Sequence, residues 1–249
     1  MSIILSHIKR FIILVMVLMI GCSPFNVLAS AAPTVEQIVS STVEVTDGSG
    51  TWSGAIIRRK GEKLYILTVL HDSELMRLKM ALGIQHFLVR INGDETQSAR
   101  LVKWDFCSEL ALLEVVDNHR HNHLQIGLVS PGIGERLLTA GNPLGLGIKY
   151  NEGYLSAKNG MYGLCTVWSV YSGGTIQGQT GSPIMTRYGR IVGFLTAVGV
   201  ETFPVGDETG SMIGIVGIPV YHLGYFIPLS TIRGFLEGVW TEPIVYYTN

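Results

Sequence analysis

Three short segments carry the residue types of a nucleophilic triad, and they follow one another along the chain. An apolar segment ends in His71, Glu109 opens a second apolar segment, and Thr180 lies in a glycine-rich turn. A hydroxyl is a weak nucleophile until an imidazole removes its proton, and a carboxylate orients that imidazole. The pattern predicts acyl-transfer chemistry with Thr180 as nucleophile, His71 as base and Glu109 as the orienting acid.

A second acid lies close to Glu109 and is the alternative candidate. Asp105 precedes Glu109 by four residues. Asp72 is a poor candidate, because a residue seldom turns back to the ring of its direct neighbour. Glu109 is therefore the preferred acid and Asp105 the alternative.

Short apolar segments that are separated by turn residues surround the three candidates. The 30 glycines of the 249-residue chain favour many tight turns, and the 47% hydrophobic content suits a folded protein. The pattern predicts an all-β sandwich or a pair of barrels, with a polar crossover starting at residue 117 and a last helix at 229–238. The expected strands are 42–46, 52–58, 63–69, 87–92, 99–104, 110–116, 136–140, 150–157, 164–171, 183–186, 191–198 and 224–227, after a short helix or arm at 32–40.

The ordered motifs resemble those of the chymotrypsin-like family, in its trypsin-like branch near the HtrA-type proteases. The resemblance runs from about Val43 to Leu236. It implies two antiparallel six-stranded β-barrels with a short C-terminal helix. Residues 32–128 would form the N-terminal barrel with the crossover, and residues 129–249 the C-terminal barrel and tail. Together the barrels would make one peptidase domain at about 42–238. Besides the histidine and acid segments, the motifs are Gly48–Gly50, Ser53–Ile57, Gly141–Gly145, Gly178–Pro183, Gly189–Gly193 and Gly224–Pro228.

The resemblance also implies the binding groups of the site. Backbone N–H groups of Gly178 and Thr180 would form an oxyanion hole, and Gly174, Thr196 and Val198 would line the specificity pocket. None of these three pocket residues is acidic. The expected substrate is a protein or peptide with a small or medium apolar residue, rather than Lys or Arg, at the cleaved position.

Two residues depart from the family pattern and leave two hypotheses open. Thr180 replaces the usual serine, which adds a β-methyl group and restricts the χ1 angle. Glu109 replaces the usual aspartate and reaches one methylene further. The chain is either an exported endopeptidase with a His71/Glu109/Thr180 triad, or a catalytically inactive pseudoprotease that acts as a peptide-binding or scaffold module.

The first 31 residues have the layout of a secretory signal. Lys9 and Arg10 precede an uninterrupted apolar segment at residues 11–20, which is short for a transmembrane helix. Further along, Ala29-Ser30-Ala31 fits a small-x-small cleavage site, and cleavage after Ala31 would release a secreted protein. The four residues ending at Cys22 instead resemble a bacterial lipoprotein box, and a lipidated Cys22 would tether the protein to a membrane. Both outcomes stay open.

The remaining features predict neither a cofactor nor a nucleic-acid partner. The net charge is −1 and no basic patch is present. His119, His121 and His123 alternate, so they could share one face of a strand and bind a metal, but their crossover position predicts a solvated loop and no metal. Cys107 and Cys165 either form a disulfide or remain buried thiols.

Overall fold

The computed structural model describes residues 32–71, 74–83, 86–162, 166–206 and 212–240. It confirms the predicted double barrel. The first barrel closes in the order β1-β2-β3-β6-β5-β4, with neighbouring strands antiparallel. Its strands are β1 (Thr42–Thr46), β2 (Thr51–Lys60), β3 (Lys63–Val69), β4 (Phe87–Ile91), β5 (Gln97–Trp104) and β6 (Leu110–Val116).

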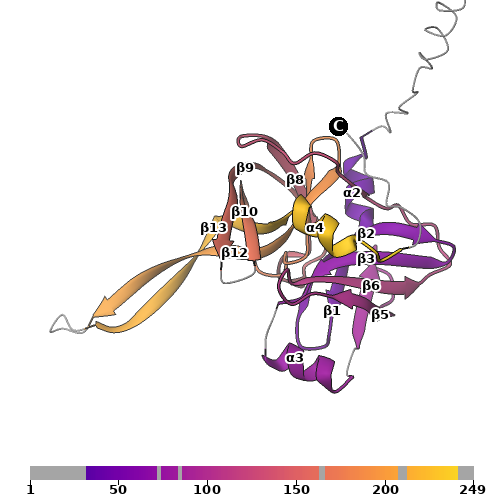
Figure 1. Ribbon diagram of the computed structural model, residues 1–249, viewed down its shortest axis with the longest axis horizontal. Coiled ribbons are helices and arrows are strands. Elements are labelled where there is room, and N and C mark those ends of the chain that lie inside the picture. The colour runs from indigo at the N-terminus through magenta and orange to yellow at the C-terminus, as the bar shows by residue number, and fades with distance from the viewer. Residues whose placement is uncertain (1–31, 72–73, 84–85, 163–165, 207–211, 241–249) are drawn as a thin grey trace, which may run out of the picture. The chain divides into compact units, whose positions relative to one another are not determined.

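The second barrel follows the order β11-β8-β9-β10-β13-β12, and pairing of β11 with β12 closes it. The short strand β7 (Gln125–Ile126) lies in the crossover and pairs in parallel with the start of β12. The other strands are β8 (Arg136–Gly141), β9 (Lys149–Tyr162), β10 (Thr166–Gly173), β11 (Pro183–Thr186), β12 (Arg190–Gly206) and β13 (Met212–Pro228). The outer parts of β12 and β13 form a hairpin that extends away from the barrel (Figure 1).

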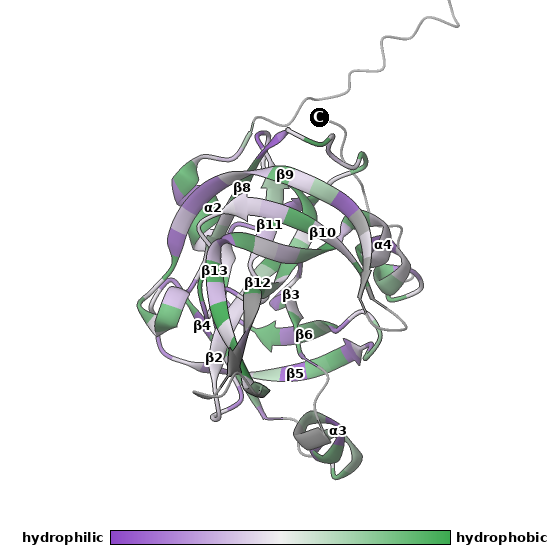
Figure 2. Ribbon diagram, turned by 90° about the vertical axis from the view of Figure 1, so that its left-hand side faces the viewer, coloured by the Kyte–Doolittle hydropathy of each residue, from purple (hydrophilic) through white to green (hydrophobic). Residues whose placement is uncertain are grey.

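Strand β4 alternates buried and exposed residues, whereas β3 and β6 are buried on both faces because they lie between the interior of the first barrel and the second barrel. Bands of hydrophobic and hydrophilic residues alternate along the strands in Figure 2, as expected when successive side chains point to opposite faces. One buried cluster lies inside the first barrel and another inside the second. A third cluster joins the two barrels, since Leu67 and Leu110 of the first barrel share it with Leu138 and Phe194 of the second. The barrels therefore pack through a shared apolar interface.

Three α-helices are present in the described ranges: α2 (Val35–Ser41), α3 (Glu74–Ala81) and α4 (Leu229–Leu236). The predicted arm is α2, which begins with a capping box between Thr34 and Gln37. The predicted last helix is α4, which is two residues shorter than expected. Ile232 and Leu236 lie on its buried apolar face. Helix α3 was not predicted, although Leu, Met, Lys and Glu are strong helix formers.

Several expectations fall outside the described ranges. These concern the signal segment with Cys22 and Ala31, the acid candidate Asp72, and Cys165 with its disulfide to Cys107. Within the described ranges, no helix is long and apolar enough to cross a membrane.

Candidate active site

The pairing of β3 with β6 brings His71 next to Glu109. Val69 lies opposite Leu110 in this pair, and the N–H of Leu70 donates to the carbonyl of Glu109 at 2.8 Å. His71 follows immediately, and its Nδ1 lies 3.2 Å from Glu109 Oε2. The imidazole is about half exposed, whereas the glutamate side chain is 18% exposed. The first barrel alone therefore assembles the predicted base and its acid.

Glu109 is held in an unusual backbone conformation. Its φ is 58°, in the left-handed region that residues other than glycine rarely adopt. The Leu70 hydrogen bond fixes the backbone, while the carboxylate accepts a hydrogen bond from Thr196 Oγ1 at 2.9 Å in addition to its contact with His71. Because Thr196 belongs to β12, the acid is held by both barrels.

The carboxylate of Asp105, the alternative acid, is hydrogen-bonded to Ser108. Its Oδ2 accepts hydrogen bonds from the N–H of Ser108 at 2.9 Å and from the Ser108 hydroxyl at 2.5 Å. These bonds stabilise the turn that leads into β6. Glu109 is thus the carboxylate that reaches His71 in this structure.

The hydroxyl of Thr180 donates its hydrogen bond to the backbone of β12 and not to the imidazole. Thr180 Oγ1 donates to the backbone carbonyl of Thr196 at 3.1 Å, whereas the side chain of His71 bonds to Glu109 within the described part of the chain. Thr180 and His71 border the same pocket. To transfer its proton to His71, this hydroxyl must therefore give up its hydrogen bond to Thr196.

The two predicted oxyanion-hole donors are oriented by the peptides that precede them. The carbonyl before Gly178 accepts a hydrogen bond from the N–H of Leu144 at 2.8 Å, and the carbonyl before Thr180 accepts one from Ser182 at 2.9 Å. In a trans peptide the C=O and N–H point in opposite directions, so both N–H groups point away from these partners. Among the described residues, neither N–H has a hydrogen-bond partner. Two such donors can stabilise an oxyanion.

The loop around Thr180 needs glycine at two positions. Gly178 has φ +94°, and a Cβ there would lie 2.5 Å from the carbonyl oxygen of Asn142. Gly181 has φ +80°, and a Cβ there would lie 2.0 Å from the carbonyl oxygen of Ser53. Ser53 also donates its N–H to Thr180 O at 2.8 Å and its hydroxyl to Gly178 O at 2.9 Å. Strand β2 of the first barrel thus clamps the loop of the second.

A pocket of about 410 Å³ borders His71 and Thr180. Its walls come from the turn after β1, the start of β2, the end of β3, the unpredicted helix α3 and the loop of Thr180. The lining residues are Asp47, Ser49, Gly50, Thr51, Trp52, Val69, Leu70, His71, Met76, Lys79, Gln177, Gly178 and Thr180.

An ion pair lies in the wall of this pocket. Lys79 Nζ is 2.7 Å from Asp47 Oδ2, and both side chains are largely shielded from solvent. Burial acts to raise the pKa of Asp47, but hydrogen bonds from Lys79 and Ser49 outweigh it and lower the pKa to about 2. The positive charge of Lys79 and the negative charge of Asp47 neutralise each other, so this wall presents little net charge to a bound side chain.

The three residues that were predicted to line the specificity pocket, Gly174, Thr196 and Val198, are not among those that border the pocket beside His71. Thr196 instead bonds to Glu109 and Thr180, which the sequence did not indicate because the contacts join distant segments. The next residue after Gly174 is Thr175, which is buried and bonds through its N–H and hydroxyl to carbonyls of β13. The loop before Thr180 is therefore fixed against β13.

Two antiparallel barrels, a histidine–carboxylate pair from the first, and a hydroxyl on a glycine-rich loop of the second define the chymotrypsin-like class of proteins. Residues 48–194 match the family model of the trypsin-like peptidase domain. The chain belongs to the trypsin-like peptidase family, as the ordered motifs predicted.

Similar proteins agree with this assignment. The chain is 28% identical over 204 residues to serine protease Do-like HtrA of Bacillus subtilis (strain 168), which covers 78% of this chain and 40% of that protein. It is also 28% identical over 151 residues to serine protease Do-like HtrB of the same organism, which covers 57% of this chain and 31% of that protein. The chain thus spans less than half the length of these curated relatives.

A solved structure has the same fold. The crystal structure of the serine endoprotease from Yersinia pestis aligns with a TM-score of 0.56 and 22% sequence identity, over 84% of this chain and 68% of that one. This similarity extends across both barrels and supports the fold alone.

Proposed function

We propose that this protein is an exported endopeptidase that hydrolyses peptide bonds by acyl transfer. Thr180 attacks the scissile carbonyl, His71 takes and later returns the proton, and Glu109 orients His71. The N–H groups of Gly178 and Thr180 stabilise the oxyanion. The supporting observation is that two backbone donors without partners among the described residues lie in the loop beside a His71–Glu109 pair.

The threonine nucleophile slows the reaction but does not prevent it in this proposal. Leaving the carbonyl of Thr196 costs about 0.5–1.5 kcal/mol, the net value of a hydrogen bond, and a new bond to His71 offsets part of that cost. The fraction of molecules in the attacking rotamer is then reduced by at most about tenfold. The β-methyl group adds a steric cost that serine would not have.

The pocket beside His71 receives the part of the substrate that follows the scissile bond. The imidazole returns its proton to the leaving amine, so the walls next to His71 face the leaving half of the substrate. Trp52 and Met76 supply apolar surface there, and the Asp47–Lys79 pair is internally compensated. We therefore expect a medium or large apolar residue after the cleaved bond and a small or medium apolar residue before it.

The inactive pseudoprotease remains the second candidate, and the observed bond from Thr180 to Thr196 favours it. Cleavage of a peptide library by wild type, Thr180→Ala and Thr180→Ser separates the two. We expect wild-type cleavage, loss of cleavage in Thr180→Ala, and equal or faster cleavage in Thr180→Ser. If wild type and Thr180→Ala are equally inert while Thr180→Ser cleaves, the protein is a pseudoprotease. Equal cleavage by all three would refute the triad.

Export rests on the basic residues Lys9 and Arg10 and the apolar segment after them. Mass spectrometry of the N-terminus from fractionated cells distinguishes a chain cleaved after Ala31 from one lipidated at Cys22. Recovery of an unprocessed chain in the cytosol would refute export.

A further inference from the structure

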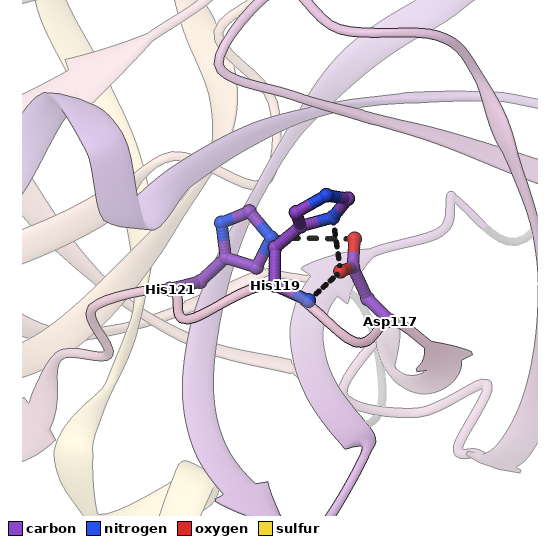
Figure 3. A group of neighbouring side chains, drawn as sticks. All are labelled: Asp117, His119 and His121. Carbon is purple, nitrogen blue, oxygen red and sulfur yellow. Dashed lines mark hydrogen bonds and ion pairs between the residues drawn. The ribbon is translucent and has the colours of Figure 1, made fainter.

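The crossover between the barrels brings a carboxylate and two imidazoles together. Asp117 Oδ1 lies 2.9 Å from His119 Nδ1, and Asp117 Oδ2 lies 3.2 Å from His121 Nε2 (Figure 3). One ligand atom from each of the three residues lies within 4.8 Å of the other two. The residues alternate in sequence directly after β6, and they share no residue with the pocket beside His71.

The cluster is not the fully solvated loop that the sequence predicted. His119 is 84% exposed, but the side chains of His121 and Asp117 are only 6% and 2% exposed. The buried Nε2 of His121 lies within ion-pair distance of Asp117, yet no residue in the described ranges gives it a hydrogen bond of acceptable geometry. A buried polar atom without a hydrogen bond costs about 1–3 kcal/mol, which a bound cation would recover.

Neighbouring groups hold the cluster in place. Gln97 of β5 donates its amide N–H to Asp117 Oδ2 at 2.5 Å, and the N–H of Asp117 donates to Glu62 O at 2.7 Å. Arg59 donates to the carbonyl of His119 at 2.5 Å. The loop is therefore tied to β5 and to the β2–β3 turn, and the carboxylate has the outer hydrogen bond that is typical of metal ligands.

We propose that Asp117, His119 and His121 bind a divalent transition-metal ion, with Zn²⁺ the best fit and water in the remaining position. A tetrahedral Zn²⁺ site with bonds of about 2.0–2.1 Å separates its ligand atoms by roughly 3.3 Å. With one ligand atom taken from each residue, the three atoms lie within 4.8 Å of one another, so small side-chain rotations bring them to this separation. The exposed ring of His119 can turn to close the remaining distance and leaves a path for the ion. Two imidazoles disfavour Mg²⁺ and Ca²⁺, which prefer oxygen ligands.

Bound metal would join the end of β6 to the start of the crossover. Since the folded state holds the three ligands together and the unfolded chain does not, binding stabilises the folded state in proportion to RT ln(1 + [L]/Kd). The site therefore predicts metal-dependent stability of the peptidase fold, and this expectation does not depend on catalysis by Thr180.

Titration of the chelator-treated full-length protein with Zn²⁺ tests the site by calorimetry and thermal unfolding. We expect saturable binding and a higher Tm with Zn²⁺ but no change of Tm with Mg²⁺. His121→Ala and Asp117→Asn should each weaken Zn²⁺ binding at least about tenfold. His123→Ala is the matched control, because His123 lies in the same loop but outside the cluster, and it should bind Zn²⁺ as wild type does.

His119→Ala keeps the test decisive if a buried variant fails to fold, because the His119 side chain is 84% exposed and we expect its loss to leave the fold intact. This variant should also weaken Zn²⁺ binding at least about tenfold. Wild-type affinity in folded His119→Ala, equal weakening in His123→Ala, or no saturable Zn²⁺ binding by wild type would overturn the proposal.

Discussion

Thr196→Val removes the hydroxyl that joins the second barrel to the acid of the first, with little change in side-chain volume. The lost hydrogen bond is 2.9 Å long, its acceptor is a carboxylate, and the Thr196 side chain is fully buried. A hydrogen bond to a charged group contributes about 1.5–3 kcal/mol. Glu109 keeps some exposure and its contact with His71, so we expect a loss near the lower limit, about 1.5 kcal/mol.

Urea unfolding measures this loss as a change in the free energy of unfolding at constant m value. Thr139→Val is the matched control, because Thr139 is also a buried threonine of the second barrel. Its hydroxyl has no hydrogen-bond partner among the described residues. We expect Thr139→Val to leave stability unchanged or to raise it slightly, since valine removes an unpaired polar group.

Activity gives a second measure of Thr196→Val. If Glu109 loses its orientation, kcat/KM for peptide cleavage should fall by about tenfold, equivalent to about 1.4 kcal/mol of transition-state stabilisation. The reasoning would be refuted if Thr196→Val and Thr139→Val had equal stabilities. Such a result would mean that the bond between Thr196 and Glu109 contributes nothing net to folding.

Three further predictions concern the site and its pocket, each measured by urea unfolding. Gly181→Ala should cost about 3 kcal/mol or more, because its Cβ would collide with backbone. Gly48→Ala, with a similar φ but no atom within 4 Å, should cost only about 1–2 kcal/mol; equal losses would contradict the packing argument. Ser182→Ala should be neutral or stabilising, since the buried Ser182 hydroxyl has no partner in the described part of the chain, and a loss above about 1 kcal/mol would disprove this. The depressed pKa of Asp47 stabilises the fold above pH 3.8, its unfolded value, and this stability is lost as pH falls through about 2. Lys79→Met should therefore reduce the acid-induced loss by about 1 kcal/mol after allowance for solvent screening, and an unchanged pH dependence would contradict the role of the pair.

The sequence predicted the barrels well because strand periodicity is a local property. Apolar alternation and turn residues located every strand of both barrels, and the glycines around Thr180 marked the loop whose backbone requires them. The outer hairpin of β12 and β13 was not predicted, because Pro204, Gly214 and Pro219 are typical of turns and not of strand interiors. Its apolar residues Val200, Ile215 and Ile218 are exposed. Helix α3 was not predicted, because its eight residues are too few for helical propensity alone to be decisive.

Side-chain partners were predictable only where two strands are adjacent. The neighbouring strands β3 and β6 bring His71 to Glu109, and both residues stand out in the sequence. The α3 wall of the pocket, with Met76 and Lys79, depends on how the chain returns from β3 to β4. The burial of His121 depends likewise on the packing of the crossover against the first barrel.

The sequence by itself determined the family, the two barrels and the positions of His71, Glu109 and Thr180, because ordered local motifs carry that information. Only the tertiary structure decided that the Thr180 hydroxyl bonds to Thr196 and that Thr196 also holds Glu109. The physical reason is that a side-chain rotamer is selected by atoms within a few ångströms, and here those atoms belong to segments far apart in the chain. Barrel closure brings these segments together, so the direction of the hydroxyl follows from the fold.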